Sequence, residues 1–253
     1  MKIIEEILAT LPDGPVLDLR VGAFWTAVVV NVGGRPQCGL ASALRRGGHH
    51  HGGGPEVPEA GRLLAYSARQ LAGLARSTSP MEASIGLAAI NALLPSSKEH
   101  WTDLNAEEII TRRGAGKQVA LIGHFPFIPR LKEIVGRLWV LEQHPQGEDL
   151  PAAAAAEVIP QADLVAITGT TLINHTFDDV LALCRPDAMI MVLGPSTPLS
   201  PVLFEHGVDL LSGALVQNVE PVLQAASQGA NFRQVHRFGV RLVTMQRRDL
   251  AGQ

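Results

Sequence analysis

The spacing of apolar residues changes near residue 97. Beyond that point short apolar runs recur, and each is followed by a turn and then by a helical pattern. Such alternation is typical of buried parallel strands connected by helices. It predicts strands at 118–122, 138–142, 163–167, 189–193, 209–214 and 238–245. It also predicts a short helix at 106–112 and further helices that begin near Ile128, Ala152, Leu172 and Leu199.

The first part of the chain has a different pattern. It predicts a helix at 2–9, strands at 16–19, 24–32 and 37–43, and then helices at 58–76 and 79–94. A Gly33-Gly34 turn joins the second and third strands as a hairpin. Ser79 and Glu82, with a proline between them, have the spacing of a capping box at the start of the last helix. We therefore expect an antiparallel meander followed by two helices.

The polar stretch 95–105 is the best position for a domain boundary. We predict an α+β domain at residues 1–97 and a Rossmann-like α/β domain at residues 98–253. The sheet of the second domain is expected to be parallel and doubly wound, because strands and helices alternate along it.

Three of the predicted strands end at a glycine that polar residues follow. Ligands of doubly wound sheets bind at the carboxyl ends of the strands, and glycine lets a ligand approach the backbone. Hydroxyl groups and helix N–H groups at these ends could bind an anion. The alternative is that the hydroxyls only cap the following helices. The candidate binding residues in these loops are Gly123, His124, Thr168, Thr170, Asn174, Gly194, Ser196 and Thr197.

His124 follows directly after a strand-ending glycine. It could ligate a metal ion or transfer a proton near neutral pH. The alternative is a hydrogen bond from its ring to the loop backbone. Further along, His175 and Asp179 are four residues apart, and a solvated helix face is the simpler interpretation of that pair.

The first strand–helix turn disfavours ordinary NAD binding. It holds Gly123 but lacks the other glycines of the dinucleotide motif, and Phe125 would obstruct a pyrophosphate. Glu142 ends the next strand, at a position where an acid commonly binds a ribose hydroxyl. Glu142 therefore has two interpretations. It could bind a nucleoside-like ligand, or it could simply be an exposed acid at the end of a strand. The basic stretch 112–117 precedes its strand and lacks the full phosphate-loop pattern, which indicates a surface turn.

The helix at 82–92 is rich in small residues, which would let another backbone come close, and we expect this to be the backbone of the second domain. Glu82, Ser84 and Asn91 lie on it and are expected to face the loops of the second domain. Capping is a sufficient explanation of Glu82, and Asn91 needs a hydrogen-bond partner if it is buried.

Composition narrows the class of protein. The net charge is −3 without a block of like charge, so nucleic acid is not the expected partner. No run approaches the roughly 20 apolar residues of a membrane span, and no secretory leader is evident. Cys38 and Cys184 form neither a disulfide framework nor a metal-type spacing, so we expect a cytoplasmic protein. The run His49–His51 between glycines could bind a metal ion weakly, but a loop without fixed geometry is expected there.

Three segments together resemble a bacterial and archaeal family of unknown function that is named for "putative heavy-metal chelation". They are residues 82–92, 123–126 and 194–207. The resemblance spans nearly the whole chain. It implies an enolase-N-terminal-like α+β domain, followed by a Rossmann-like domain, with a site between them. The barrel that carries the catalytic metal ligands of enolase is missing, so enolase chemistry is not implied.

These observations lead to one main hypothesis and two alternatives. We expect a small anionic ligand, such as a metal chelator or a metal–chelate complex, to be bound or processed in the crevice between the domains, with a transition-metal ion held by His124. The first alternative is a transferase or lyase with a nucleotide-like cofactor. The second is a non-catalytic regulatory or scaffold protein of metal homeostasis. A homo-oligomer is expected if the strand at 24–32 is an open sheet edge.

Overall fold

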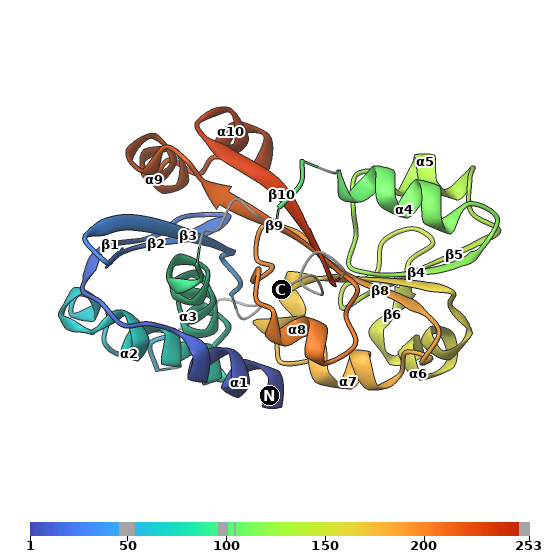
Figure 1. Cartoon of the computed structure of the whole chain (residues 1–253), viewed down its shortest axis with the longest axis horizontal. Helices are drawn as coiled ribbons and strands as arrows, with labels where there is room; N and C mark the ends of the chain where they lie inside the picture. Colours follow the sequence, from blue (N-terminus) through green and yellow to red (C-terminus); the bar gives the residue numbers. More distant parts are fainter. Residues whose placement is uncertain (46–53, 96–100, 104, 248–253) are drawn as a thin grey trace.

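Two β-sheets of different kinds organise the chain (Figure 1). The computed structural model describes residues 1–45, 54–95, 101–103 and 105–247. We call residues 1–95 the N-terminal part and residues 101–247 the C-terminal part. The predicted combination of a small antiparallel meander with a larger, mostly parallel α/β sheet is confirmed.

The N-terminal part holds a three-stranded antiparallel sheet in the order β1-β2-β3. Its elements are α1 (Lys2–Thr10), β1 (Val16–Val21), β2 (Trp25–Val32), β3 (Arg35–Ser42), η1 (Leu63–Ala65), α2 (Ala68–Ala72), η2 (Gly73–Arg76) and α3 (Pro80–Leu93). Strand β2 is the central strand. The prediction that it forms an open edge for another subunit is therefore wrong, and the proposed homo-oligomer loses its basis.

The predicted helix at 58–76 is also wrong, because two short 3₁₀ turns and a short α-helix occupy that range. Ser67 is extended, with φ −70° and ψ 157°, and its side chain forms a capping box with Gln70 at the start of α2. The box predicted at Ser79 and Glu82 is absent: the Ser79 hydroxyl donates to the carbonyl of Glu56, and Glu82 accepts from Ser77. The apolar spacing continues across these interruptions of the helix, so the sequence pattern does not reveal them.

The C-terminal part holds a seven-stranded sheet in the order β10-β9-β8-β7-β4-β5-β6. Its strands are β4 (Gln118–Ile122), β5 (Arg137–Glu142), β6 (Leu150–Pro151), β7 (Leu164–Thr168), β8 (Met189–Leu193), β9 (Leu210–Val216) and β10 (Val240–Gln246). All neighbours are parallel except β10, which is antiparallel to β9. The six predicted strands are present. The seventh, β6, has two residues, too few to leave a periodic signal in the sequence.

Short helices connect these strands. They are α4 (Ala106–Gly114), α5 (Ile128–Lys132), η4 (Ala152–Ala154), α6 (Ala155–Val158), η5 (Ile159–Gln161), η6 (Gly169–Leu172), α7 (Phe177–Ala182), α8 (Val202–Glu205), α9 (Val219–Ser227) and α10 (Phe232–Arg237). Figure 1 shows α4 and α5 on one face of the sheet and α6, α7 and α8 on the other. The helix expected from Leu172 begins instead at Phe177, because a tight turn intervenes.

The strand order reverses between β4 and β7. Strands β5 and β6 continue the sheet on one side of β4, and β7, β8 and β9 continue it on the other. In doubly wound sheets the chain leaves two such strands toward opposite faces, and a crevice opens at their carboxyl ends. The fold therefore places a crevice beside Gly123 and Thr168, where β4 and β7 end.

The small sheet is packed on both faces. Val28 and Val30 belong to the core formed with the helices of the N-terminal part, whereas Trp25 and Val29 belong to a second core together with Val222 and other apolar residues of the C-terminal part. Figure 1 shows α9 lying across this second face. The apolar core is therefore continuous between the two parts.

Small residues of helix α3 pack against the N-terminal part itself, where the sequence had suggested a close approach of the second domain. A Cβ at Gly86 would lie 1.9 Å from the backbone nitrogen of Ala75, and one at Gly39 would lie 2.1 Å from the carbonyl oxygen of Ala88. Glycine at these two positions lets α3 approach η2 and β3 in direct backbone contact.

This packing predicts that Gly86→Ala destabilises the protein, although alanine normally favours a helix. Overpacking against backbone atoms should lower the free energy of unfolding by about 3 kcal/mol or more. At Gly73 a Cβ would meet only the end of the Arg76 side chain, at 3.1 Å. Gly73→Ala should therefore be neutral or stabilise by up to about 1 kcal/mol. Urea unfolding of both variants measures the difference, and equal effects would contradict the close approach.

Candidate functional site

A cavity of about 520 Å³ lies at the carboxyl ends of β4, β5 and β7. We call it the switch cavity, because it lies at the reversal of strand order. Six of the predicted binding residues line it: Gly123, His124, Glu142, Thr168, Thr170 and Asn174. Residues that were not predicted also line it, among them Leu44, His144, Thr176 and Asp179.

Gly123 sets the shape of the first loop. Its φ is +111°, a conformation that side chains rarely adopt. A Cβ at this position would lie 3.0 Å from Cγ2 of Thr168 on the neighbouring strand. Glycine therefore lets the loop after β4 turn sharply beside the end of β7.

Glu142 holds this loop against the next strand. Its Oε1 accepts a hydrogen bond from the backbone nitrogen of His124 at 2.7 Å, and its Oε2 accepts one from that of Gln143 at 3.1 Å. Both oxygens of the Glu142 carboxylate already accept backbone N–H groups, so a ribose hydroxyl would have to share one of these oxygens. The geometry thus gives Glu142 a structural role and adds no support to the nucleotide alternative.

The ring of His124 is oriented by Asp149. Nδ1 of His124 lies 2.9 Å from Oδ2 of Asp149, which also accepts the backbone N–H of Gln146 at 3.2 Å. The Asp149 side chain is only 6% exposed, whereas that of His124 is 51% exposed. Because the carboxylate accepts the Nδ1 proton, Nε2 of a neutral ring carries the lone pair. Among the described residues Nε2 has no hydrogen-bond partner.

Threonines form the second loop. Oγ1 of Thr168 lies 3.1 Å from Oγ1 of Thr170, and the Thr171 hydroxyl donates to the carbonyl of Thr168 at 2.7 Å. The capping interpretation holds for Thr168, whose side chain accepts from the Thr170 nitrogen. The element that follows is a 3₁₀ turn of four residues. An anion site built on a helix N-terminus is therefore weaker here than the sequence suggested.

The ionisable residues described in the lining of the switch cavity are carboxylates and histidines. Glu142 and Asp179 contribute the carboxylates, and His124 and His144 contribute the imidazoles. Its described lining includes neither lysine nor arginine. This lining does not favour a bare anion.

The expectation that all the candidate residues converge on one hollow is wrong, because six of them lie elsewhere. These are Glu82, Ser84, Asn91, Gly194, Ser196 and Thr197. Asn91 and Thr197 line a separate hollow of about 230 Å³. Glu82 accepts the hydroxyl of Ser77 at 2.5 Å.

Ser196 joins the two parts of the chain. It is 2% exposed, and its Oγ accepts the backbone N–H of Ser42 at 2.9 Å and donates to the Ser42 hydroxyl at 3.1 Å. The amide of Asn91 donates to the carbonyls of Leu40 at 2.8 Å and Ser196 at 3.3 Å. These polar groups satisfy backbone groups in the contact between the parts, which explains why they do not face the cavity.

Ser84 reaches the cavity indirectly. Its hydroxyl donates to the carbonyl of Pro80 at 2.7 Å and accepts the backbone N–H of Leu44 at 3.2 Å. Leu44 in turn lines the switch cavity. The N-terminal part therefore contributes an apolar wall to a cavity that is otherwise built by the C-terminal part.

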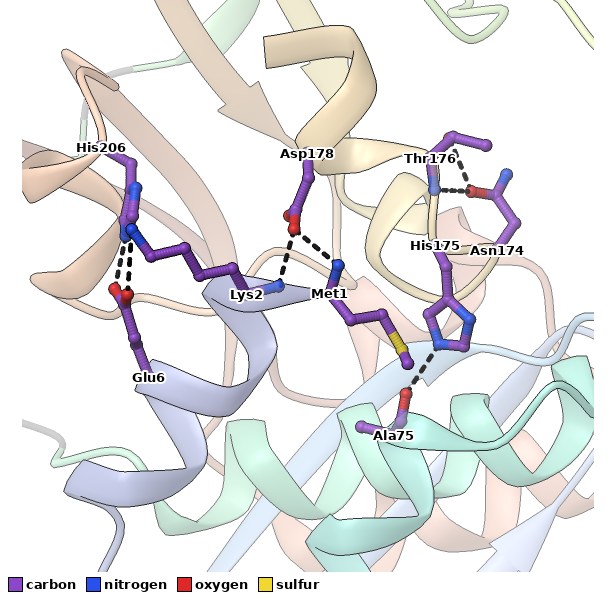
Figure 2. A network of polar contacts seen from close by, with 9 residues as sticks. All are labelled: Met1, Lys2, Glu6, Ala75, Asn174, His175, Thr176, Asp178 and His206. Carbon is purple, nitrogen blue, oxygen red and sulfur yellow. Dashed lines mark hydrogen bonds and ion pairs between the residues drawn. The ribbon is translucent and has the colours of Figure 1, made fainter. Parts of the chain in front are cut away.

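A second set of contacts joins α1 and η2 to the chain between residues 174 and 206 (Figure 2). Asp178 accepts the backbone N–H of Lys2 at 2.7 Å, and Nε2 of His206 lies 2.5 Å from Oε2 of Glu6. The hydrogen bond from His206 lowers the pKa of Glu6. His175 donates from Nε2 to the carbonyl of Ala75 at 2.8 Å. The expectation of a solvated face is therefore wrong for His175, whereas Asp179 is exposed and lines the cavity.

The described residues contain no group of three or more His, Cys, Asp and Glu side chains placed to hold a metal ion. The run His49–His51 lies outside the described residues. A preformed cage of protein ligands around His124 is thus absent from the described part of the chain.

The fold and the cavity define a two-part α/β protein, with a Rossmann-like sheet whose switch point is open. Residues 105–245 match the model of the DUF364 family, and residues 4–94 match that of the DUF4213 family, both described as "Putative heavy-metal chelation". The chain belongs to the DUF364 family. The domain boundary at residues 97 and 98 remains our proposal, as does the enolase-like character of the first domain.

Solved structures support the fold. A protein of unknown function from the DUF364 family of Desulfitobacterium hafniense DCB-2 superposes with a TM-score of 0.82 and 28% identity, over 97% of this chain and 98% of that one. A DUF364 protein of unknown function from Pyrococcus horikoshii gives a TM-score of 0.78 at 22% identity, with the same coverage. An uncharacterized protein of Methanocaldococcus jannaschii, MJ0500, is 24% identical over 222 residues, 83% of this chain and 82% of its own length.

Among the described residues, no helix combines the length and the apolar character that a bilayer crossing demands.

The role of Ser196 leads to a stability prediction. Ser196→Ala leaves the backbone N–H of Ser42 without its partner, which should lower the free energy of unfolding by about 1–3 kcal/mol. Because Ser196 does not line the switch cavity, ligand binding by the folded variant should not change. Chemical unfolding and calorimetry test the two statements separately. Lost binding at unchanged stability would instead place Ser196 in the ligand site.

Both cysteines should be unreactive in the folded protein. Burial raises the pKa of Cys38 to about 12 and that of Cys184 to about 11, and neither lines the switch cavity. Alkylation by iodoacetamide at about pH 8 should be about a hundredfold or more slower than for a free cysteine, because the thiolate reacts. Mass spectrometry of folded and denatured samples measures both rates. Rapid modification of the folded protein would show an accessible thiolate and reopen a role for sulfur in metal binding.

Proposed function

We propose that the protein binds a small metal–chelate complex in the switch cavity, with Nε2 of His124 completing the coordination of the metal. The observation that carries this proposal is the hydrogen bond between His124 and Asp149. A carboxylate on the other ring nitrogen fixes the tautomer and orientation of a metal-binding histidine and raises its basicity. His124 has such a partner, and its side chain is half exposed at the cavity.

The chemistry of the lining supports a chelate over a bare metal ion. A bare transition-metal ion needs several protein ligands in a fixed geometry, and the described residues hold no such group. A chelator supplies most of the ligands itself and leaves a coordination position for one imidazole.

The charge of the lining supports a chelate over a bare anionic chelator. The ionisable lining residues are carboxylates and histidines, without lysine or arginine to neutralise an anion. A bound metal ion offsets the negative charge of its chelator, so the complex enters at a smaller electrostatic cost. The expectation of an anionic ligand is thereby narrowed to an anionic chelator that carries its metal.

The size of the cavity is consistent with this ligand. Small-molecule sites usually have volumes of about 300–1,000 Å³, and the switch cavity has about 520 Å³. Apolar walls from Leu44, Ile122 and Leu141 surround the polar groups. Neither the nucleotide-cofactor alternative nor the scaffold alternative has an observation of this kind in its favour.

Isothermal calorimetry with nickel iminodiacetate, a neutral complex with open coordination positions, tests the proposal. The metal-free protein should carry His49→Ala, His50→Ala and His51→Ala, because three adjacent histidines can bind the probe on their own. We expect one equivalent to bind to this background protein. His124→Ala should abolish the binding, and Asp149→Asn should weaken it by about 10–100-fold through loss of the orienting carboxylate.

The matched control is His236→Ala. His236 is an exposed histidine that contacts the ring of Phe232 and does not line the switch cavity. Its replacement should leave the affinity unchanged. Absence of binding to the background protein, or equal binding by His124→Ala, would refute the proposed function.

A further inference from the structure

The segment 174–179 has two functional sides. Asn174, Thr176 and Asp179 line the switch cavity. His175 and Asp178 instead contact the N-terminal part, through the carbonyl of Ala75 and the backbone N–H of Lys2. Figure 2 shows the side chains of His175 and Asp178 directed toward α1 and η2, with Asn174 and Thr176 on the other side of the turn.

The backbone at His175 produces this division. Its φ is +60°, which makes it the one residue other than glycine with positive φ in the described part of the chain. Asn174 closes the turn, because its Oδ1 accepts the backbone N–H of Thr176 at 3.2 Å and the Thr176 hydroxyl at 2.7 Å. Left-handed backbone at a non-glycine residue persists only where surrounding contacts hold it. The bond from His175 to Ala75 is such a contact.

The Ala75 carbonyl is itself fixed in place. It belongs to η2, against which Gly86 of α3 packs so closely that a Cβ would lie 1.9 Å from the Ala75 nitrogen. The acceptor of the His175 bond is therefore part of the packed core of the N-terminal part. A shift of that part relative to the C-terminal part would move the acceptor and release the turn.

We propose that His175 is a positioning residue, which holds the cavity wall of Asn174 and Thr176 in its binding arrangement only while the N-terminal part is docked. The proposal rests on the proposed function in one respect, that the switch cavity is the ligand site. By linkage, a ligand that contacts this wall also stabilises the docking of the N-terminal part. No ligand atom needs to touch the N-terminal part at this point.

Three variants separate this role from general stability. His175→Asn keeps a residue that tolerates left-handed backbone but is too short to replace the imidazole at Ala75. His175→Gln can return a donor to roughly the position of Nε2. His206→Gln is the matched control, since it alters the contact with Glu6, which joins the same two parts but involves α8, outside the cavity lining.

The first measurement needs no ligand. Hydrogen exchange followed by mass spectrometry should show faster exchange in the peptide containing residues 174–179 of His175→Asn, with near wild-type exchange in His175→Gln. His206→Gln should leave that peptide protected. Unchanged exchange in His175→Asn would overturn the proposal, whether or not the cavity binds the probe.

The second measurement uses nickel iminodiacetate in the histidine-run background described above. His175→Asn should weaken its binding at least fivefold, the lower range of coupling between sites. His175→Gln should restore most of the affinity, and His206→Gln should leave it unchanged. Equal weakening by His175→Asn and His206→Gln would overturn the positioning role, because loss of docking alone would then explain both. If the wild-type background does not bind the probe, the proposed function fails, and the exchange experiment alone decides on His175.

Discussion

The close approach of β4 and β7 at their carboxyl ends is the constraint on which the site depends. Two neighbouring parallel strands lead into segments that diverge from each other, so the space between them can be filled only by loops or by a ligand. Gly123 meets this constraint with a positive φ and no Cβ, within contact distance of Thr168. Glu142 then fixes the loop by accepting the backbone N–H of His124. The positive φ of Gly123, its lack of a Cβ and the hydrogen bond to Glu142 together place His124 at the cavity.

The N-terminal part completes this arrangement from outside the sheet. Ser84 holds Leu44 at the cavity wall, Ser196 pairs with Ser42, and His175 pairs with Ala75. Each of these contacts pairs a side chain with a backbone group: Ser84 and Ser196 accept an N–H, and His175 donates to a carbonyl. Since an unsatisfied buried backbone group costs about 1–3 kcal/mol, a few such bonds are enough to fix the position of one part on the other. The strain of about 1–3 kcal/mol expected for left-handed backbone at His175 is consistent with a turn that is held by its surroundings.

The sequence predicted the larger sheet well, because its strands are simple apolar runs separated by glycine turns. It also predicted six residues of the cavity, since strand ends of a doubly wound sheet meet at one edge. The sequence did not predict the position of a side chain, or the end of a helix, where a contact with a distant part of the chain determines it. A hydroxyl such as that of Ser196 has the same sequence context whether it faces a ligand or the backbone of Ser42. Asp149 lies in a loop whose path back to His124 has no periodic signal, and the helix at 58–76 was predicted from apolar spacing that continues across the break at Ser67.

The proposed function requires that His124 present Nε2 to a metal held by a small chelator at the reversal of strand order. Anomalous X-ray diffraction from crystals soaked with nickel iminodiacetate tests this claim most directly. We expect a nickel peak in the switch cavity, about 2.1 Å from Nε2 of His124, the usual distance between a transition metal and an imidazole nitrogen. A nickel peak only at another histidine, with the cavity unoccupied, would contradict it.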